Sequence, residues 1–363
     1  MVLLTACGRT SPPESVEEAE PIEALPATPD PATPAMPEFV IDLNPGKLVV
    51  TLSVDAAEAR FMVSEPIYAE IEFRGDPGVE VQMSWMGRNE LGRPSNYALA
   101  FVGEAGPLAV PDVGMEFGGQ SWTAAVGSKP ARQRLFLPSW VVELEPGRYT
   151  LTAKTTVEAR GAESAQWQSV EVSLALPLEV SPDDDARMAA LIEALALAAK
   201  GDDSDRSREA IEQLAAIDDP RTLPHWLELV VIPDYERRFK AIVRLAKFDD
   251  PRALAAVIRA SQTKPDELPR DRYTTEALRF ESAGQLRVTA AYALDERDEP
   301  EALAALLALE NDPHDSVRLI VCQRAGRLEG ERGLAILERM VKDSSEMVRG
   351  EAQRFSSERG TAR

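Results

Sequence analysis

Residues 286–318 read LRVTAAYALDERDEPEALAALLALENDPHDSVR, and this stretch decides how the C-terminal half of the chain folds. It holds two runs of small and apolar residues at helical spacing, with a charged segment and Pro300 between them, and Asp312-Pro313 begins the next run. An Asp followed by Pro suits the start of a helix, because the carboxylate caps free backbone amides and proline needs no amide there. The stretch therefore predicts a pair of helices.

The start signal of this helix pair recurs along the chain. Asp218-Asp219-Pro220-Arg221 returns 31 residues later as Asp249-Asp250-Pro251-Arg252. A fixed period of this length is typical of stacked helical arrays. We therefore expect an all-α solenoid of about five helix pairs over residues 183–358.

Four arginines follow the same period. Arg287, Arg318 and Arg349 are spaced by 31 residues, and Arg238 precedes Arg287 by 49, which is one period plus an 18-residue insertion. We place this insertion at about residues 262–280, as a loop between the two helices of the third unit. Insertions in solenoids emerge on one face, often the face that binds a partner.

These units resemble HEAT repeats, specifically the short HEAT-like units of phycobilisome lyases. In that family an Asp near the start of the second helix and an Arg within it form a hydrogen-bonded ladder between neighbouring repeats. Asp312 with Arg318 and Asp343 with Arg349 match this pattern. The resemblance implies a structural role for these residues, since a charged pair at each interface of a stack fixes its register.

The earlier repeats depart from the family pattern. Ile232 and Glu281 stand where Arg238 and Arg287 would need an Asp. We therefore expect the ladder of side chains only in the later repeats. Lyase activity is not implied by the repeat, because function resides in sites rather than in folds.

Residues 38–180 show a different period. Val79, Val81 and Met83 alternate with polar residues, and residues 170–176 repeat this two-residue pattern between turn signals rich in Gly and Pro. The alternation predicts short strands of an antiparallel β-sandwich. Residues 144–151, LEPGRYTL, resemble the late hairpin of bacterial immunoglobulin-like modules. We therefore expect an all-β immunoglobulin-like sandwich in front of the solenoid.

The N-terminus carries a candidate lipidation signal. Leu4-Thr5-Ala6-Cys7 resembles the lipobox of bacterial lipoproteins, in which the Cys becomes the acylated N-terminus. We interpret residues 1–7 as a truncated signal and residues 8–37, rich in Pro and Glu, as a disordered tether. The resemblance implies attachment to the membrane through the lipid on Cys7, in the cell envelope, and the periplasmic side of the outer membrane is favoured.

Composition excludes several classes of function. The chain of 363 residues has a formal net charge of -21, which argues against nucleic-acid partners because phosphate binding relies on Lys and Arg. Two Cys and two His exclude a zinc array and a disulfide scaffold. Cys322 lies among apolar residues and reads as a small buried hydrophobe. Without a catalytic, cofactor or metal motif, we predict a protein that is not an enzyme and needs no metal or small-molecule cofactor.

Two hypotheses for binding follow. The first is a scaffold for an unknown protein partner, and Arg270, Arg272 and Tyr273 in the insertion are its candidate contacts. The alternative is a carbohydrate or peptidoglycan binder that uses aromatic residues of the sandwich, Trp122 above all. The opposing interpretation, which we favour, is that the aromatic residues around Trp122 pack beneath a long loop, because large aromatic side chains are mostly buried.

Overall fold

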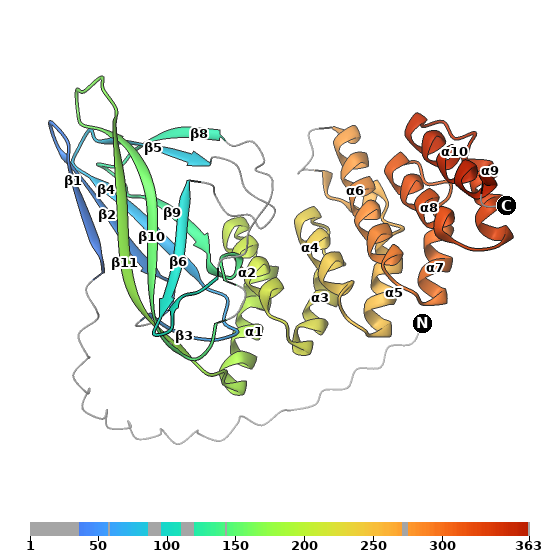
Figure 1. Ribbon diagram of the computed structural model, residues 1–363, viewed down its shortest axis with the longest axis horizontal. Helices are drawn as coiled ribbons and strands as arrows, with labels where there is room; N and C mark the ends of the chain where they lie inside the picture. Colours follow the sequence, from blue (N-terminus) through green and yellow to red (C-terminus); the bar gives the residue numbers. More distant parts are fainter. Residues whose placement is uncertain are drawn as a thin grey trace, which may run out of the picture. The chain divides into compact units, whose positions relative to one another are not determined.

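A β-sheet region is followed by a helical region (Figure 1), in a computed structural model that describes residues 36–56, 59–85, 96–109, 120–141, 144–270 and 275–361. The strands lie between Glu38 and Ser181, and the α-helices lie between Asp185 and Thr361. Both regions belong to one compact unit that begins at Met36. The predicted fold class, a β region followed by an α region, is confirmed.

The β region contains two sheets. One has the strand order β1-β2-β4-β9, and the other has the order β3-β11-β10-β5-β8, with β6 paired to β10 and β7 to β6. The strands are β1 (Glu38–Asp42), β2 (Lys47–Val54), β3 (Arg60–Met62), β4 (Tyr68–Gly75), β5 (Glu80–Trp85), β6 (Tyr97–Gly103), β7 (Gly106–Pro107), β8 (Gln120–Ala125), β9 (Ala131–Phe136), β10 (Gly147–Arg160) and β11 (Gln168–Ser181).

The two-residue alternation fills the core between these sheets. Leu48, Val50 and Leu52 on β2 are fully buried, and alternate residues of β11 face the same core. Tyr97 and Phe101 on β6 are also buried there. Of the two possibilities for the sandwich aromatics, these two rings therefore pack inside rather than lining an exposed surface.

The helical region contains ten α-helices within the described residues. They are α1 (Asp185–Lys200), α2 (Ser204–Ala216), α3 (Leu223–Leu229), α4 (Tyr235–Leu245), α5 (Pro251–Ala260), α6 (Glu276–Asp295), α7 (Pro300–Leu307), α8 (Asp315–Arg327), α9 (Glu331–Met340) and α10 (Glu346–Thr361). As the sequence predicts, Asp250 caps α5 just before Pro251, and its carboxylate accepts a hydrogen bond from the backbone amide of Arg252 at 2.8 Å.

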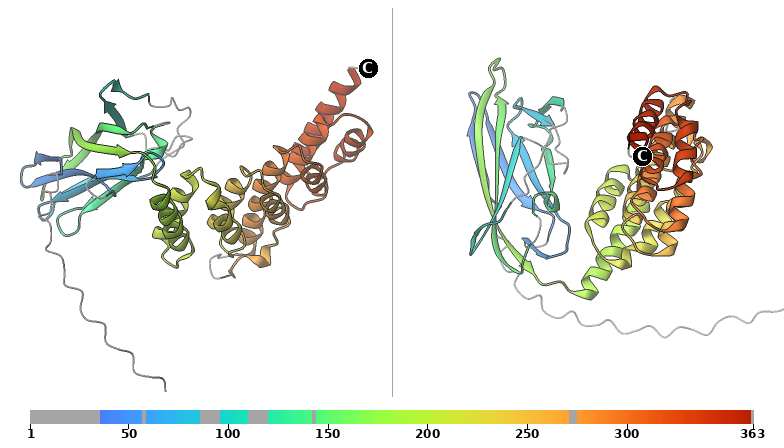
Figure 2. Two further views of the ribbon diagram at one scale, coloured as in Figure 1. Left: turned by 90° about the horizontal axis from the view of Figure 1, so that it is seen from below. Right: turned by 45° about the vertical axis from the view of Figure 1, so that its right-hand side comes forward.

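The ten helices form five antiparallel pairs that stack side by side (Figures 1 and 2). The second helices of the pairs, α2, α4, α6, α8 and α10, each contact the next one, and the first helices form the other layer. One continuous apolar core runs between the layers, and small residues such as Ala290 and Ala291 on α6 are fully buried in it. Small side chains let neighbouring helices approach closely.

The insertion differs in part from the expected loop. Residues 276–280 belong to the first turn of α6, whose start is capped by the Thr275 hydroxyl accepting from the Leu278 amide at 3.1 Å. Earlier in the insertion, residues Pro265–Glu267 form a single 3-10 turn. The insertion therefore lengthens the second helix of its unit, because a hydroxyl cap with Glu276 in the first turn is itself a helix-start signal.

The β region packs directly against the first helix pair. Met62 on β3 is 1% exposed and belongs to the apolar core of the helices. Polar contacts surround it: the Arg187 guanidinium on α1 donates to the Glu65 carboxylate at 2.6 Å, and the Gln213 side chain on α2 donates to the Pro66 carbonyl at 2.9 Å. These contacts join the strand region to α1 and α2 over more than a single linker peptide.

Candidate functional site

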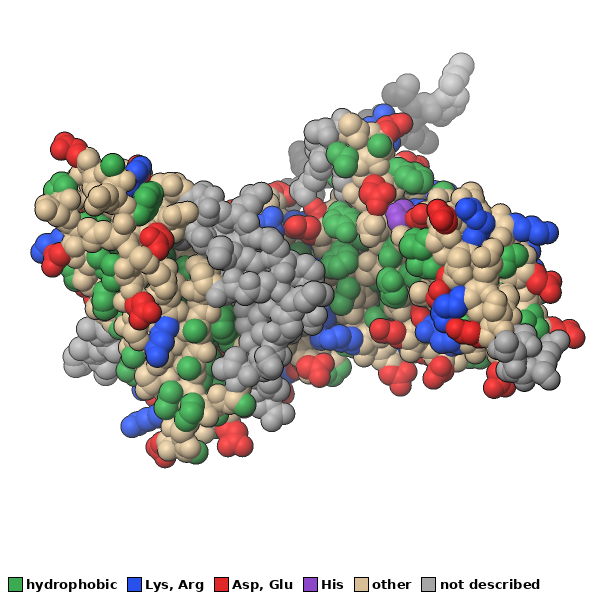
Figure 3. Space-filling model, turned by 45° about the horizontal axis from the view of Figure 1, so that its top comes forward, with side chains coloured by type: hydrophobic (Ala, Val, Ile, Leu, Met, Phe, Trp, Pro, Cys, Tyr) green, Lys and Arg blue, Asp and Glu red, His purple; other side chains and the backbone are tan. Residues whose placement is uncertain are grey.

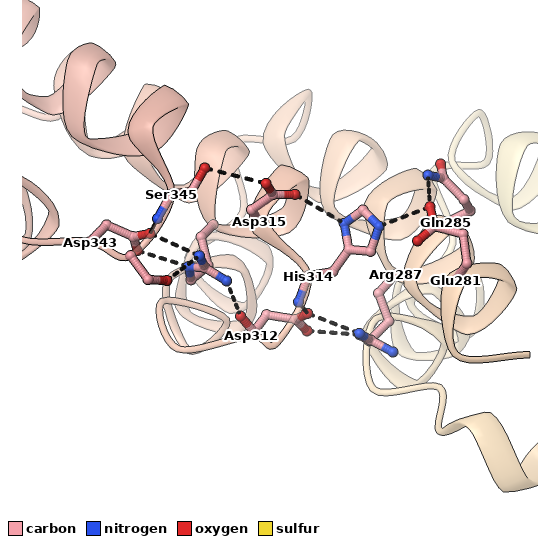
Figure 4. Close-up of polar contacts among 10 residues, drawn as sticks. Glu281, Gln285, Arg287, Asp312, His314, Asp315, Asp343 and Ser345 are labelled. Atoms are coloured by element: carbon pink, nitrogen blue, oxygen red, sulfur yellow. Dashed lines mark hydrogen bonds and ion pairs between the residues drawn. The ribbon is translucent and has the colours of Figure 1, made fainter. Parts of the chain in front are cut away.

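A buried ion pair connects α6, the second helix of the third unit, to the turn that precedes α8 in the fourth unit. Arg287 on α6 donates from Nε and Nη2 to the two carboxylate oxygens of Asp312, at 2.8 and 2.9 Å (Figure 4). The two side chains are only 6% and 5% exposed. A bidentate Arg–carboxylate contact fixes two groups in one plane. This rung therefore sets both the distance and the register between the two units.

The next rung repeats the same geometry. Arg318 on α8 donates to both oxygens of Asp343 at 2.8 Å, and its Nη1 donates to the backbone carbonyl of Asp312 at 2.8 Å. Arg349 binds the carbonyl of Asp343 in the same way, at 2.7 Å. Each Arg thus bonds the backbone of its own unit and, at Arg287 and Arg318, the carboxylate of the following unit. The hydrogen bonds from Arg318 hold the pKa of the Asp343 carboxyl below its usual range.

The ladder also reaches into the early repeats, where it was not expected. Arg238 donates from Nε to the Ile232 carbonyl at 2.8 Å and from Nη1 to the Glu267 carboxylate at 3.0 Å. The carbonyl that Arg287 binds is that of Thr263, at 2.9 Å, rather than that of Glu281. Thr263 precedes Arg287 by the usual six residues plus the 18 inserted ones, so counting across the insertion would have found it.

A histidine lies beside this ladder at the start of α8. His314 is 8% exposed, and its Nε2 lies 3.2 Å from the Glu281 carboxylate on α6 (Figure 4). Its ring occupies the space above Gly284, where an added Cβ would lie 2.3 Å from the imidazole. Hydrogen bonds from Gln285 and His314 lower the pKa of Glu281. A glycine inside this helix is therefore explained by the close approach of the ring.

The outer surface of the second helices changes character along the stack. Side chains three residues before, one after and five after each ladder arginine share one helix face. In the middle units six of these nine positions are apolar, and we call them the middle stripe: Tyr235, Phe239, Val243, Val288, Tyr292 and Leu319. The other three positions are Gly284, Asp315 and Gln323. Val243 and Tyr292 are 38% and 52% exposed.

The same positions are polar at both ends of the stack. The first unit places Ser204, Arg208 and Glu212 there, and α10 places Glu346, Gly350 and Arg354. The terminal units of a solenoid need such a polar face for solubility. The middle units do not follow that rule, because they leave aromatic and aliphatic groups partly in solvent. Hydrophobic side chains are visible among the charged ones on the helical region in Figure 3.

A cavity of about 700 Å³ lies next to the middle stripe, and we call it the β9–α4 groove. One wall is formed by β9 and the turn that follows it, another by α2, and the third by Tyr235 and Phe239 on α4. Pockets of this size are large enough for a drug-sized ligand or a short peptide segment. Nothing in the sequence predicted the groove, because its walls come from segments about 100 residues apart.

Comparison with known protein families bears on the helical region. The family of HEAT repeats matches residues 188–279 and 272–355. The C-terminal region contains HEAT repeats. No curated protein gives a match to the chain. Within the described residues, no helix is long and apolar enough to cross a membrane.

The residues that the sequence predicted as partner contacts are not members of the middle stripe. Arg270 is exposed at the end of the described part of the insertion, whereas Arg272 and Tyr273 lie outside the described residues, as Cys7 does. Trp122 lies on β8 opposite Met83, and its side chain is outside what the structure describes. Of these residues the structure describes the side chain of Arg270 alone, so the predicted partner contacts stay a prediction.

Cys322 and His225 are both buried in the helical region. Cys322 on α8 is fully buried, and burial raises the pKa of its thiol to about 12. His225 on α3 is 9% exposed and its Nε2 lies 3.3 Å from the Glu193 carboxylate. Among the described residues, no three His, Cys, Asp or Glu side chains converge as metal ligands would.

Proposed function

We propose that this chain is a non-enzymatic scaffold protein of the cell envelope, anchored by a lipid on Cys7, which binds a partner protein through the second helices of its HEAT repeats. HEAT repeats are consistent with binding of a protein partner, since stacked repeats present an extended surface. The lipobox-like residues Leu4-Thr5-Ala6-Cys7 support the anchor, and the Pro-rich residues that follow support a tether to an immunoglobulin-like β region.

The middle stripe carries the proposal of protein binding. Its positions are equivalent by the repeat to polar ones in the first and last units, so the apolar residues are not a requirement of the HEAT fold itself. Exposed aromatic side chains such as Tyr292 present apolar surface to water in the free protein, and a complex would bury that surface. Interfaces are enriched in such residues.

Site-specific crosslinking in cells tests the protein-binding proposal. A photoreactive amino acid replaces Tyr292 on the stripe or Ala304, which is exposed on α7 in the layer of first helices. We expect one recurrent crosslinked protein from position 292 and none from position 304. Equal crosslinking from both positions, or no adduct from position 292, would show that the stripe does not bind a partner.

The lipid anchor is tested separately. Mass spectrometry of the protein isolated from cells should show the peptide that begins at Cys7 carrying acyl chains, and Cys7→Ala should release the protein from the membrane fraction. An unmodified peptide that runs through Cys7 would exclude the anchor and leave the protein-binding proposal standing.

A further inference from the structure

The wall of the β9–α4 groove nearest the β region is built around Tyr68 on β4. The Tyr68 hydroxyl donates to the Glu212 carboxylate on α2 at 2.5 Å. The guanidinium of Arg134 on β9 lies over the Tyr68 ring, 4.4 Å from its centroid, and pairs with Glu209 on α2. Phe136 completes this wall, since its ring centroid lies 5.0 Å from that of Tyr68. The wall thus combines aromatic surface with carboxylates.

Negative charge exceeds positive charge around the groove. Its lining holds four cations and four carboxylates. Three more carboxylates, Asp55, Glu70 and Glu72, pair with Arg132 and Arg134 from the side of the sheet. Because Arg74 also pairs with Glu72, seven carboxylates share five cations in this neighbourhood.

Glu212 is the carboxylate with the least compensation. Its described hydrogen-bond partner is the neutral Tyr68 hydroxyl, and burial together with the bond to Glu212 raises the pKa of that hydroxyl. Neighbouring Asp55 responds to the same environment, because burial, opposed by Arg134, raises its carboxyl pKa. A further cation at this end of the groove would stabilise the ionised carboxylates.

The opposite wall carries two aromatic rings beside the charged side chains of Glu236 and Lys240. Tyr235 and Phe239 on α4 lie with ring centroids 6.1 Å apart and nearly parallel planes. Both rings are partly exposed and face a groove whose other side carries Phe136. An aliphatic or aromatic side chain between Phe136 and the α4 rings would remove apolar surface from water on both of its faces. The groove therefore pairs a hydrophobic slot with an acidic end.

We propose that the β9–α4 groove binds an extended segment of the partner protein that carries a Lys or Arg next to an apolar side chain. The basic group lies at Glu212 and Glu209, and the apolar side chain lies between Phe136 and Phe239. This inference rests on the proposed function, because it gives the chemistry of the partner. The formal net charge of -21 adds long-range attraction for a basic segment.

Selection from a random peptide library on the intact protein tests the proposal. We expect the enriched peptides to join Lys or Arg to Leu, Ile, Phe or Pro within a few residues. For the best fluorescein-labelled peptide, measured by fluorescence anisotropy, Glu212→Gln should weaken binding about tenfold, as expected for the loss of one charged contact worth about 1.4 kcal/mol. Phe239→Ser should weaken it at least as much.

Two variants serve as matched controls. Glu228→Gln removes an exposed carboxylate from α3, and Leu197→Ser removes an exposed apolar group from α1. Neither residue lines the groove or belongs to the middle stripe. Both should leave peptide affinity unchanged. Circular dichroism of all four variants should be that of the parent protein, which separates loss of binding from loss of fold.

The outcomes distinguish this inference from the proposed function. Enrichment of acidic peptides, no enrichment at all, or equal affinity of the parent and Glu212→Gln for the selected peptide would overturn the groove proposal. Crosslinking from position 292 would still stand in those cases. Conversely, a groove that binds basic peptides without any crosslink from position 292 would confine binding to the groove and refute the role of the stripe.

Discussion

Replacing Arg287 by Met tests whether the buried rungs hold the stack together. The substitution keeps a long apolar side chain but leaves the Asp312 carboxylate, 5% exposed, without its cation. Breaking a buried pair in this way costs about 3 to 5 kcal/mol, because the remaining charge stays desolvated. For a helical region of this size, about 2 to 4 °C per kcal/mol converts this loss to a fall in Tm of roughly 6 to 20 °C.

The double variant Arg287→Met with Asp312→Leu tests whether the loss of stability comes from the unpaired Asp312 charge. With both charges removed, no unpaired charge stays buried, and the unfolding free energy should return to within about 1 to 2 kcal/mol of the parent value. The assay is urea unfolding followed by circular dichroism at 222 nm, which reports on the helices. A double-mutant cycle then gives the coupling between the two side chains, expected at several kcal/mol.

Arg354→Met on α10 is the control. Arg354 pairs with Glu351 and Glu358 at 2.8 and 2.7 Å, but it is 49% exposed. Exposed pairs contribute no more than about 1 kcal/mol, so this variant should change Tm by only a few degrees. If Arg287→Met is no more damaging than Arg354→Met, or if the double variant is as unstable as the two single losses combined, the rung does not couple the repeats.

Three further predictions follow from the same region. Arg318 lowers the pKa of Asp343, so this carboxylate stabilises the fold at pH values above its unfolded pKa of about 3.9. The contribution is lost as the pH falls through the lower folded pKa. Asp343→Asn should therefore reduce the fall in unfolding free energy measured between pH 5 and 2. Cys322, with its thiol pKa raised to about 12, should resist iodoacetamide at pH 8 in the native protein and react fully in urea, as peptide mapping by mass spectrometry can show. Gly284→Ala should destabilise the protein, because the new Cβ would lie 2.3 Å from the His314 ring. This clash outweighs the preference of about 1 kcal/mol for Ala over Gly in helices. Combining Gly284→Ala with His314→Ala should recover the stability measured by urea unfolding.

Much of the fold could be predicted from the sequence, because its signals are local. The Asp-Pro pairs start helices through their own backbone, and the 31-residue period reports one repeating environment. The alternation on the strands likewise follows from one buried face. Even the ladder arginines were visible, since each lies at a fixed distance from its neighbours. The sequence patterns succeeded where a residue acts on positions close to it in the chain.

The contacts that the sequence did not predict join residues that only the tertiary structure brings close together. Glu267 lies inside the insertion and has no repeat equivalent, so only the three-dimensional position of Arg238 shows that it completes a rung. The β9–α4 groove depends on Arg134 and Glu209 meeting, and these residues are 75 positions apart in the sequence. The middle stripe was detectable in principle, by comparing equivalent positions of successive second helices.

The buried rungs and the surface proposed for binding are linked by geometry. Each rung fixes the rotation of one second helix relative to the next, and this rotation brings Phe239, Val288 and Leu319 to equivalent places on neighbouring helices. A slipped register would place these side chains on different faces of their helices and end their alignment. Phe239 belongs to both the stripe and the β9–α4 groove. One partner that fills both surfaces should therefore lose affinity most on Phe239→Ser, whereas Glu212→Gln and Tyr292→Ser should each remove only their own part of the contact.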